Sequence, residues 1–175
     1  NRPSEEVGLL FKLFLTVLKN ETTKLNDNNI KLKIMGDLSV FTPEIQRLAN
    51  DAEKQLSNNN GLNLVIAANY GGRWDIVESA KKIAIKSVNG ELDPEKIDTS
   101  LFNAHSSLAE FPKVDLLIRT SGELRISNFL LWEIAYSELY FCNTLWPNFD
   151  EHELDTAIES FHLRERRFGK RNGEK

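Results

Sequence analysis

Short apolar runs alternate along this chain with longer segments of helical period, and this alternation restricts the fold more than any other feature. Residues 30–35 alternate apolar and polar side chains, as a half-buried strand does, and residues 62–69 are almost uniformly apolar, as a strand buried on both faces is. A third strand is predicted over residues 114–120. Strands separated by helices favour right-handed parallel crossovers, so we expect a single α/β domain over residues 1–175, with a mainly parallel β-sheet flanked by helices.

Helical spacing of apolar residues predicts the elements that flank this sheet. The first helix should begin at Pro3, which suits a first helical turn, and should continue to about Leu25. Further helices are predicted over residues 42–56, 73–87, 127–139 and 150–168, with short helices over 91–108. The periodicity of the first helix indicates core packing and by itself nothing more specific.

The composition of the 175 residues excludes several classes of function. The formal net charge is −4, so no nucleic-acid partner held by bulk electrostatics is expected. The longest apolar stretch, residues 7–18, is interrupted by Gly8, Lys12 and Thr16 and is too short to cross a bilayer, so membrane contact should be peripheral at most. No secretory signal is expected, and the single cysteine, Cys142, fits a reducing, cytoplasmic compartment.

Polar, glycine-bearing segments directly follow the predicted strands. They span residues 36–37, 69–75 and 119–128, and in open α/β sheets ligands bind beyond the carboxyl ends of the strands. In the third segment, Arg119 and Arg125 flank a glycine turn that leads into a predicted helix start. Arginine presents a planar fork of donors that suits phosphate oxygens, and the unpaired N–H groups of a helix start add a partial positive charge. The segment therefore indicates a diphosphate site.

Other interpretations of these segments stay open at this point. Arg119 and Arg125 could instead form surface salt bridges with Glu123 and Asp115. The glycine pair at residues 71–72 is weak support for a phosphate loop when taken alone. A Rossmann-like nucleotide-binding fold ranks last, because no Gly-x-Gly-x-x-Gly follows any predicted strand.

Carboxylates and histidines give weaker signals. Asp75, which follows Trp74, could be an active-site carboxylate, but we expect it to cap the start of a helix. His105, His152 and His162 are scattered without the spacing of metal ligands, so structural roles are expected for them.

Four blocks of residues form a distinctive pattern in chain order. The longest runs from Asp115 to Tyr140 and contains Ile-Arg-Thr-Ser-Gly-Glu and Ser-Asn-Phe-Leu-Leu-Trp, with Glu133 where glutamine would be usual after the tryptophan. The others are residues 67–75, residues 145–147 with 164–169, and Asn1-Arg2-Pro3 with Glu6. Together they resemble the signature blocks of the cis-prenyltransferases, particularly the bacterial undecaprenyl diphosphate synthases.

This resemblance implies a function. Members of the family condense isopentenyl diphosphate onto an allylic diphosphate such as farnesyl diphosphate, form Z double bonds and so make a long polyprenyl diphosphate for cell-wall synthesis. The resemblance also implies a Mg²⁺ cofactor, a homodimer and a hydrophobic tunnel for the polyprenyl chain. The alternative within the same fold is a non-catalytic partner subunit, against which the intact Arg119, Arg125 and Ser127 argue.

The resemblance also implies roles for individual residues. Arg119, Arg125 and Ser127 would hold the diphosphate of isopentenyl diphosphate, with the backbone of Ile126 beside them. Arg2 would lie near the diphosphates of both substrates, and Glu138 would serve the magnesium site.

The expected position of Glu138 raises a geometric difficulty. In one continuous helix, Ser127 and Glu138 would share a face but would lie about 16 Å apart along the axis, too far to share one diphosphate. Either the helix is broken, or Glu138 acts at another site such as that of a dimer partner. A solvated or dimer-contact glutamate is an equal alternative.

The family places a Met-Asp-Gly-Asn block, with the aspartate proposed to bind magnesium, ahead of the residues seen here. Since this sequence has no such block, we expect the chain to contain no catalytic carboxylate and to be inactive by itself. A run of aromatic residues nevertheless supports the homodimer, because aromatic side chains are enriched in interface cores. The run comprises Trp132, Tyr136, Tyr140, Phe141 and Trp146.

Overall fold

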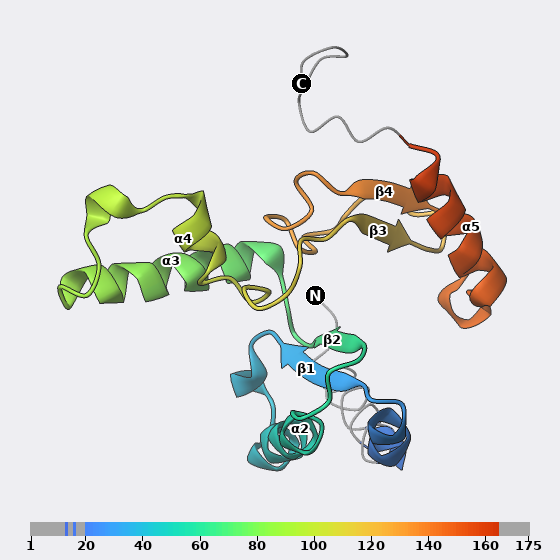
Figure 1. Ribbon diagram of the computed structural model, residues 1–175, viewed down its shortest axis with the longest axis horizontal. Coiled ribbons are helices and arrows are strands. Elements are labelled where there is room, and N and C mark those ends of the chain that lie inside the picture. The colour runs from blue at the N-terminus through green and yellow to red at the C-terminus, as the bar shows by residue number, and fades with distance from the viewer. Residues whose placement is uncertain (1–12, 14–15, 17–19, 165–175) are drawn as a thin grey trace. The chain divides into compact units, whose positions relative to one another are not determined.

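The computed structural model of this chain describes residues 13, 16 and 20–164 (Figure 1). The predicted helix start at Pro3, the candidate binding residue Arg2 and residues 165–169 lie outside the described residues. The chain forms two compact units, Asn1–Tyr70 and Gly71–Lys175. The described part of each unit contains a pair of parallel strands together with helices, which confirms the α/β class and the parallel pairing.

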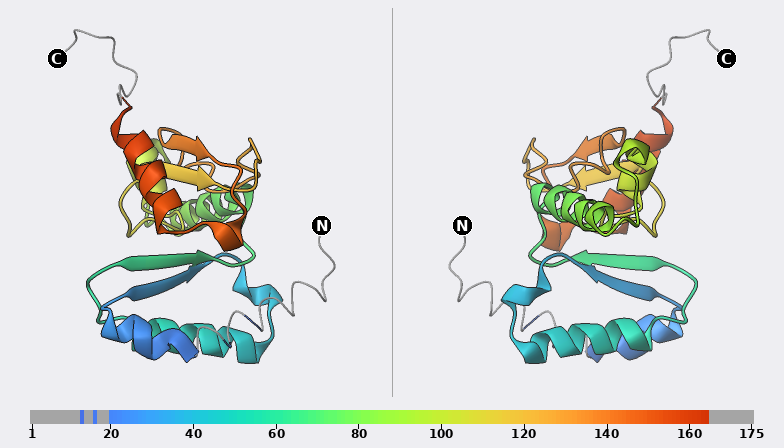
Figure 2. Two further views of the ribbon diagram at one scale, coloured as in Figure 1. Left: turned by 90° about the vertical axis from the view of Figure 1, so that its right-hand side faces the viewer. Right: turned by 90° about the vertical axis from the view of Figure 1, so that its left-hand side faces the viewer.

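The first unit is built on two strands with helices on one side. β1, Lys31–Met35, pairs in parallel along its length with β2, Asn63–Ala67. Helical residues 20–27 and helix α2, Pro43–Gln55, lie on the same side of this pair in both views of Figure 2. A short 3-10 helix, η1, Leu38–Val40, follows β1.

The core of the first unit lies between β1 and α2. Alternate residues of β1 and one face of α2 supply most of it, as their sequence periods predicted. Its buried members are Leu32, Ile34, Phe41, Ala49, Ala52, Leu56 and Ala68.

The prediction that residues 62–69 are buried on both faces is wrong. Leu64, Val65 and Ile66 of β2 are only half-buried, and Leu62 is 65% exposed. The physical reason is that, within the described part of its own unit, β2 pairs with β1 alone and helices cover one face of the pair. An apolar run thus predicted the strand correctly and its burial incorrectly.

The second unit begins with helix α3, Gly72–Val88. A 3-10 helix, η2, Pro94–Lys96, and a short helix, α4, Thr99–Asn103, follow it, as expected for residues 91–108. Strand β3, Leu116–Arg119, then pairs in parallel with β4, Glu138–Phe141. The last elements are η3, Trp146–Asn148, and α5, Glu151–His162, which contacts β4.

The predicted helix over residues 127–139 is not formed. Turns occupy most of this segment, and β4 begins at Glu138. The backbone φ angles of Ser127, Asn128 and Leu130 are 47°, 64° and 47°, which a right-handed helix does not permit. The apparent helical period came from Leu130 and Ile134, which are four residues apart and both buried without being on a helix. Ser127 and Glu138 therefore do not share one helix, and the separation of about 16 Å expected along a helix axis does not apply to them.

The terminal helix begins as predicted and ends earlier. The Asp150 side chain accepts a hydrogen bond from the Glu153 backbone N–H at 3.0 Å and so caps α5. The helix ends at His162, whereas residues 150–168 were predicted to be helical. No helix in the described part of the chain is long and apolar enough to span a membrane.

Candidate active site

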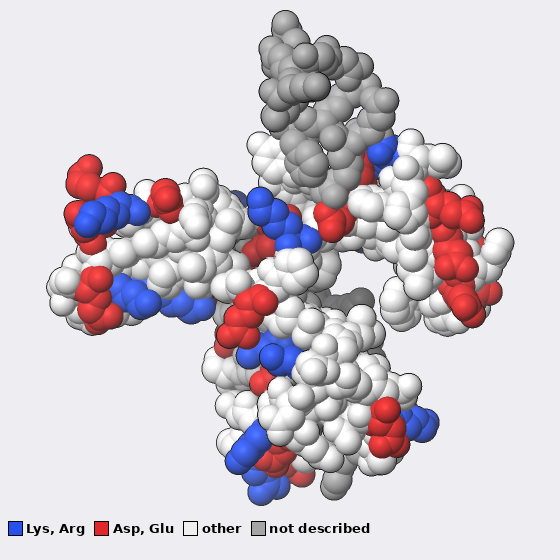
Figure 3. Space-filling model, viewed as in Figure 1, with Lys and Arg blue, Asp and Glu red and all other residues white. Residues whose placement is uncertain are grey.

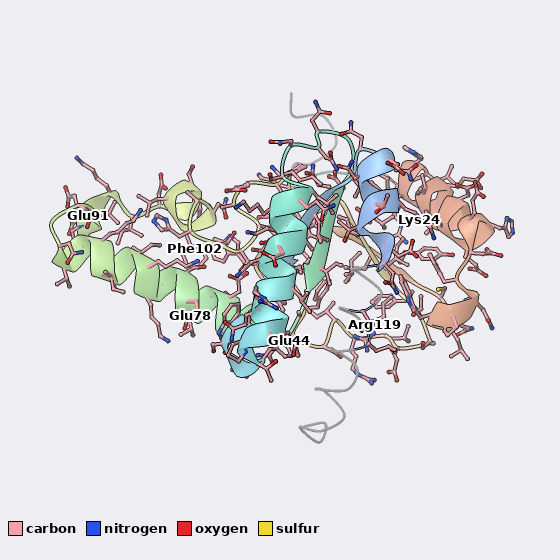
Figure 4. The ribbon with its side chains drawn as sticks, turned by 90° about the horizontal axis from the view of Figure 1, so that it is seen from below. Lys24, Glu44, Glu78, Glu91, Phe102 and Arg119 are labelled. Carbon is pink, nitrogen blue, oxygen red and sulfur yellow. The ribbon has the colours of Figure 1, made fainter. Side chains whose placement is uncertain are left out.

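A pocket of about 470 Å³ lies at the carboxyl end of β3, where the sequence predicted a ligand site. Arg119, labelled in Figure 4, is the last residue of the strand and forms part of the wall. The lining residues combine apolar side chains with one cation, one anion and two hydroxyl groups. They are Leu117, Ile118, Arg119, Thr120, Ser121, Glu123, Ile126 and Phe129.

Backbone hydrogen bonds to the segment after β4 fix the loop that follows Arg119. The Ser121 N–H donates to the carbonyl of Thr144 and the Gly122 N–H to that of Cys142, both at 2.9 Å. Ser121 and Gly122 have φ angles of 70° and 68°, so the chain reverses through two left-handed residues. Glycine suits the second of these positions, because it adopts positive φ without steric cost.

The two arginines of the loop differ in their ion pairing. The Arg125 guanidinium pairs with the Glu123 carboxylate, and the Arg125 side chain is 65% exposed. By contrast, no carboxylate among the residues that the structure describes pairs with the guanidinium of Arg119. The salt-bridge interpretation therefore describes Arg125, while Arg119 presents its charge to the pocket.

The structure brings only some of the predicted binding residues into the pocket wall. Arg119 and Ile126 line it, whereas Arg125 and Ser127 do not. Arg125 is connected to the wall through its ion pair with Glu123, and Ser127 follows Ile126 directly in the chain. The four residues thus lie at the end of β3 and on the loop that follows it.

Glu138 lies at the opposite end of the β3–β4 pair. It is paired with Leu116, three residues before Arg119, so it lies about 10 Å along the strands from the pocket end. Its carboxylate accepts a hydrogen bond from Nη1 of Arg164 at 2.9 Å, and the same nitrogen donates to the carbonyl of Leu139 at 3.0 Å. Glu138 is therefore an ion-pair partner of Arg164 in this structure.

Metal ligands do not cluster in the described part of the chain, where no group of three or more His, Cys, Asp or Glu residues could hold an ion. Glu138 contributes a single carboxylate, which Arg164 already neutralises. The described residues thus do not fit a complete metal centre by themselves.

Sequence reasoning missed the role of Asn128. Its carbonyl accepts a hydrogen bond from the Gly72 N–H at 2.7 Å, and its side-chain oxygen accepts one from the Arg73 N–H at 2.9 Å. Asn128 therefore binds the first N–H groups of α3, which have no partner within the helix. The one available signal was an asparagine next to a serine, which favours a turn more than a helix.

Asp75 does not cap its helix as predicted. Gly71 occupies the cap position and has no side-chain cap. The Asp75 carboxylate is almost fully buried and accepts hydrogen bonds from the N–H of Ser107 at 3.1 Å and from its hydroxyl at 2.8 Å. Asp75 thus connects the first turn of α3 to the segment after α4.

Glu133 lies close enough to Asp75 to feel its charge. Desolvation by burial raises the pKa of Glu133, and the negative charge of Asp75 raises it further, while hydrogen bonds from its own backbone and from Ser106 lower it. The net pKa is higher than usual for a glutamate. One oxygen of this carboxyl group is buried without a hydrogen-bond partner among the described residues.

The distribution of charge is compatible with an anion site in a chain of net charge −4. Figure 3 shows acidic side chains gathered over α5, whose sequence contains Glu151, Glu153, Asp155 and Glu159. The excess negative charge of the second unit is thus concentrated on this helix, whereas the end of β3 and the loop after it carry two arginines and one glutamate. A local positive potential can coexist with a negative total charge.

An α/β protein with parallel strands and a cationic loop at a strand's carboxyl end is the class that this fold and pocket define. Comparison with known proteins narrows the class. A family model described as "Putative undecaprenyl diphosphate synthase" matches residues 1–169. The chain belongs to this prenyltransferase family, which confirms the resemblance drawn from its sequence blocks.

Relatives and solved structures agree with this assignment. The chain is 52% identical over 168 residues to a ditrans,polycis-undecaprenyl-diphosphate synthase, (2E,6E)-farnesyl-diphosphate specific, from Vibrio parahaemolyticus, a match that covers 96% of this chain and 67% of the relative. The enzyme of the same description from Escherichia coli K12 is 49% identical over 169 residues, which is 97% of this chain and 67% of the relative. The chain thus spans about two thirds of the length of these relatives.

Two solved structures share the fold. Lavandulyl diphosphate synthase from Lavandula x intermedia, in complex with dimethylallyl diphosphate, has a TM-score of 0.92 and 38% identity, covering 97% of this chain and 74% of that one. A probable undecaprenyl diphosphate synthase from Campylobacter jejuni has a TM-score of 0.85 and 31% identity, in a match that covers 97% of this chain and 77% of that one. The chain is therefore an α/β prenyltransferase by fold as well as by sequence.

Proposed function

We propose that this chain belongs to an enzyme that condenses isopentenyl diphosphate onto farnesyl diphosphate and forms Z double bonds, to give undecaprenyl diphosphate. The observation that carries this proposal is the identity of about half of the residues to farnesyl-specific undecaprenyl diphosphate synthases along 96% of the chain. The pocket supports it independently, because Arg119 lines it, pairs with no carboxylate of the described residues and is the kind of cation that binds a diphosphate. The alternative of a non-catalytic partner subunit finds no support among these relatives, which are described as synthases.

In each cycle one C–C bond forms, the allylic C–O bond breaks, and diphosphate and one proton leave. Within this scheme the loop after β3 positions the acceptor. Arg119 would bind phosphate oxygens of isopentenyl diphosphate directly, and the backbone of Ile126 and the hydroxyl of Ser127 would complete the contacts. Fixing the diphosphate fixes the double bond that attacks the allylic carbon, so the arginines contribute to turnover as well as to binding.

The ion pair with Glu123 affects how Arg125 can contribute to binding of the substrate diphosphate. A carboxylate in the pocket wall would repel an incoming diphosphate unless a cation neutralised it, and Arg125 is that cation in the free protein. An exposed ion pair contributes only about 0–1 kcal/mol, so Arg125 can turn from Glu123 to a phosphate at little cost. We expect this exchange when the substrate binds.

Magnesium is proposed from the family resemblance, with Glu138 as one residue of its site. Because no group of three or more His, Cys, Asp or Glu residues in the described part of the chain could hold an ion, the ligands beside Glu138 would come from other residues of the protein or from a partner subunit.

Further proposals concern the whole protein. They are a single domain over residues 1–175 with a tunnel for the polyprenyl chain, a homodimer, a cytoplasmic location with peripheral membrane contact at most, and a product that serves cell-wall synthesis. Exposed aromatic residues support the homodimer: Tyr136 and Trp146 are 73% and 72% exposed. Trp132 is 37% exposed, while it also packs on Phe102 and donates its indole N–H to Asn103.

The proposal is tested with the full-length protein, farnesyl diphosphate and radiolabelled isopentenyl diphosphate. Incorporation into a long product with Z double bonds, identified by chromatography and NMR, is expected. Lack of incorporation by a folded protein with magnesium present would refute the proposed activity. Binding of isopentenyl diphosphate without turnover would instead favour the non-catalytic partner subunit.

A further inference from the structure

Asn128 connects the candidate substrate loop to the start of α3. Its carbonyl and its side-chain oxygen accept hydrogen bonds from the N–H groups of Gly72 and Arg73, at 2.7 and 2.9 Å. The cap residue of α3, Gly71, has no side chain that could bind these groups. A residue 55 positions away from Arg73 therefore provides the cap.

Asn128 also belongs to a turn that forms part of the pocket. The Phe129 N–H donates to the carbonyl of Ile126 at 3.1 Å, and both Ile126 and Phe129 line the pocket. Ser127 and Asn128 are the central residues of this turn, and both have positive φ. A shift of the turn would thus move two pocket residues and Ser127 together.

The turn is costly for Ser127 and favourable for Asn128. Asparagine adopts a left-handed backbone more readily than most residues, whereas serine at a φ of 47° is held against its preference. The two hydrogen bonds to α3 offset this cost, because they fix the turn at its second central residue. Without them Ser127 would relax toward a negative φ and the Ile126–Phe129 turn would open.

We propose that Asn128 is a positioning residue for the condensation, which holds Ser127 and Ile126 in the geometry that binds the diphosphate of isopentenyl diphosphate. This inference rests on the proposed function. Asn128 itself does not line the pocket, so it acts through the turn and through α3.

The contact can be broken from the α3 side as well. A Cβ added to Gly71 would lie 2.7 Å from Nδ2 of Asn128, so Gly71→Ala would push the amide away from the helix start. This substitution leaves the sequence of the turn unchanged. It therefore tests the connection without altering the backbone preferences of Ser127 or Asn128.

Three substitutions of Asn128 in the full-length protein separate its possible contributions. Asn128→Asp keeps an oxygen acceptor and tolerates positive φ; Asn128→Gly keeps the backbone but loses the side-chain acceptor; Asn128→Ala loses both features. We expect the KM for isopentenyl diphosphate to stay within about twofold in the first, and to rise about three- to tenfold in the second and further in the third. The KM for farnesyl diphosphate should not change.

A matched control is Asn59→Ala in the first unit. The Asn59 side chain donates to the carbonyl of Ile30 at 2.8 Å, so its loss should lower the melting temperature without changing either KM. Gly71→Ala should resemble Asn128→Gly, and Asn128→Gly keeps the test valid if Asn128→Ala does not fold.

The outcomes separate this inference from the proposed function. Wild-type KM values in Asn128→Gly and Gly71→Ala, with only a lower melting temperature as in Asn59→Ala, would overturn the role of Asn128. A defect in Asn128→Asp as large as in Asn128→Gly would also overturn it, because the retained acceptor would then have no effect. A wild-type protein that does not incorporate isopentenyl diphosphate would refute the proposed function itself.

Discussion

Replacing the two arginines of the candidate loop should have unequal effects, because among the described residues only Arg125 pairs with a carboxylate. Arg119 lines the pocket and has no carboxylate partner among the described residues. Arg119→Ala should therefore remove a charge-assisted contact worth about 1.5–3 kcal/mol, which corresponds to a decrease of about 10- to 150-fold in kcat/KM for isopentenyl diphosphate.

Arg125→Ala should remove less contact energy with the substrate than Arg119→Ala does, and it should also weaken substrate binding through a second effect. Under the proposed function, Arg125 would give up its pair with Glu123 to bind a phosphate, so its net contribution would be smaller than that of Arg119. Its loss would also leave the Glu123 carboxylate of the pocket wall without its ion-pair partner, so that Glu123 would repel the substrate. We therefore expect Glu123→Gln to restore part of the activity of Arg125→Ala and none of that of Arg119→Ala.

The assay measures initial rates with radiolabelled isopentenyl diphosphate at saturating farnesyl diphosphate, with all proteins in full-length form. The wild type is compared with Arg119→Ala, with Arg125→Ala, and with each of these combined with Glu123→Gln. Thermal melts followed by circular dichroism check that each variant folds. Arg47→Ala, an exposed arginine on α2, is the matched control and should leave kcat/KM unchanged. Wild-type kinetics in Arg119→Ala would refute the reasoning. A kcat/KM of Arg125→Ala with Glu123→Gln no higher than that of Arg125→Ala alone would refute it as well.

Further predictions concern the metal, the pH dependence of stability and the assembly. If Glu138 serves a metal site, Glu138→Gln should raise the Mg²⁺ concentration needed for half-maximal activity while Arg164→Ala, which breaks the same ion pair, should not; equal behaviour of the two would limit Glu138 to the ion pair. The pKa of Glu133 is raised above 4.5, so the folded protein binds this proton more tightly than the unfolded chain, and stability falls as the pH rises from 4.5 through the raised pKa. Glu133→Gln should therefore be more stable than the wild type at pH 7 but not below pH 4.5. Urea unfolding at both pH values tests this, and equal stability of the two proteins at pH 7 would contradict it. Sedimentation at micromolar concentration should show a dimer of the full-length protein, and a single monomeric species would oppose that proposal.

The strands and most helices could be predicted because local sequence and tertiary burial agree there. β1 alternates in sequence and buries Leu32 and Ile34 on one side, and α2 carries its apolar face where the period of 3.6 residues puts it. The helix predicted over residues 127–139 is wrong because a spacing of four residues between buried side chains, as for Leu130 and Ile134, occurs both in a helix and in a compact series of turns. Only the backbone angles distinguish the two structures.

The candidate site was predictable where its chemistry is local. Arg119 and Ile126 lie at the pocket because they follow a strand that the sequence identified, and the carboxyl end of such a strand is where ligands bind. The pairing of Glu138 with Arg164 depends on where β4 meets the end of α5, which no local pattern specifies. The buried position of Asp75 against Ser107 has the same origin, since it joins segments 32 residues apart.

The glycine pair at residues 71–72 shows how two distant sequence blocks form one functional unit. As a phosphate-loop signal the pair is weak, yet a Cβ on Gly72 would lie 2.7 Å from the backbone nitrogen of Leu131, and one on Gly71 would lie equally close to the Asn128 amide. The glycines are therefore needed so that the turn after Ile126 can pack on the start of α3. This packing lets Asn128 reach the N–H of Arg73 and holds a backbone conformation at Ser127 that serine does not prefer. The requirement for glycine at residues 71–72 thus originates in the geometry of the turn over residues 126–129. Under the proposed role of Asn128, a substitution in either segment should change the KM for isopentenyl diphosphate.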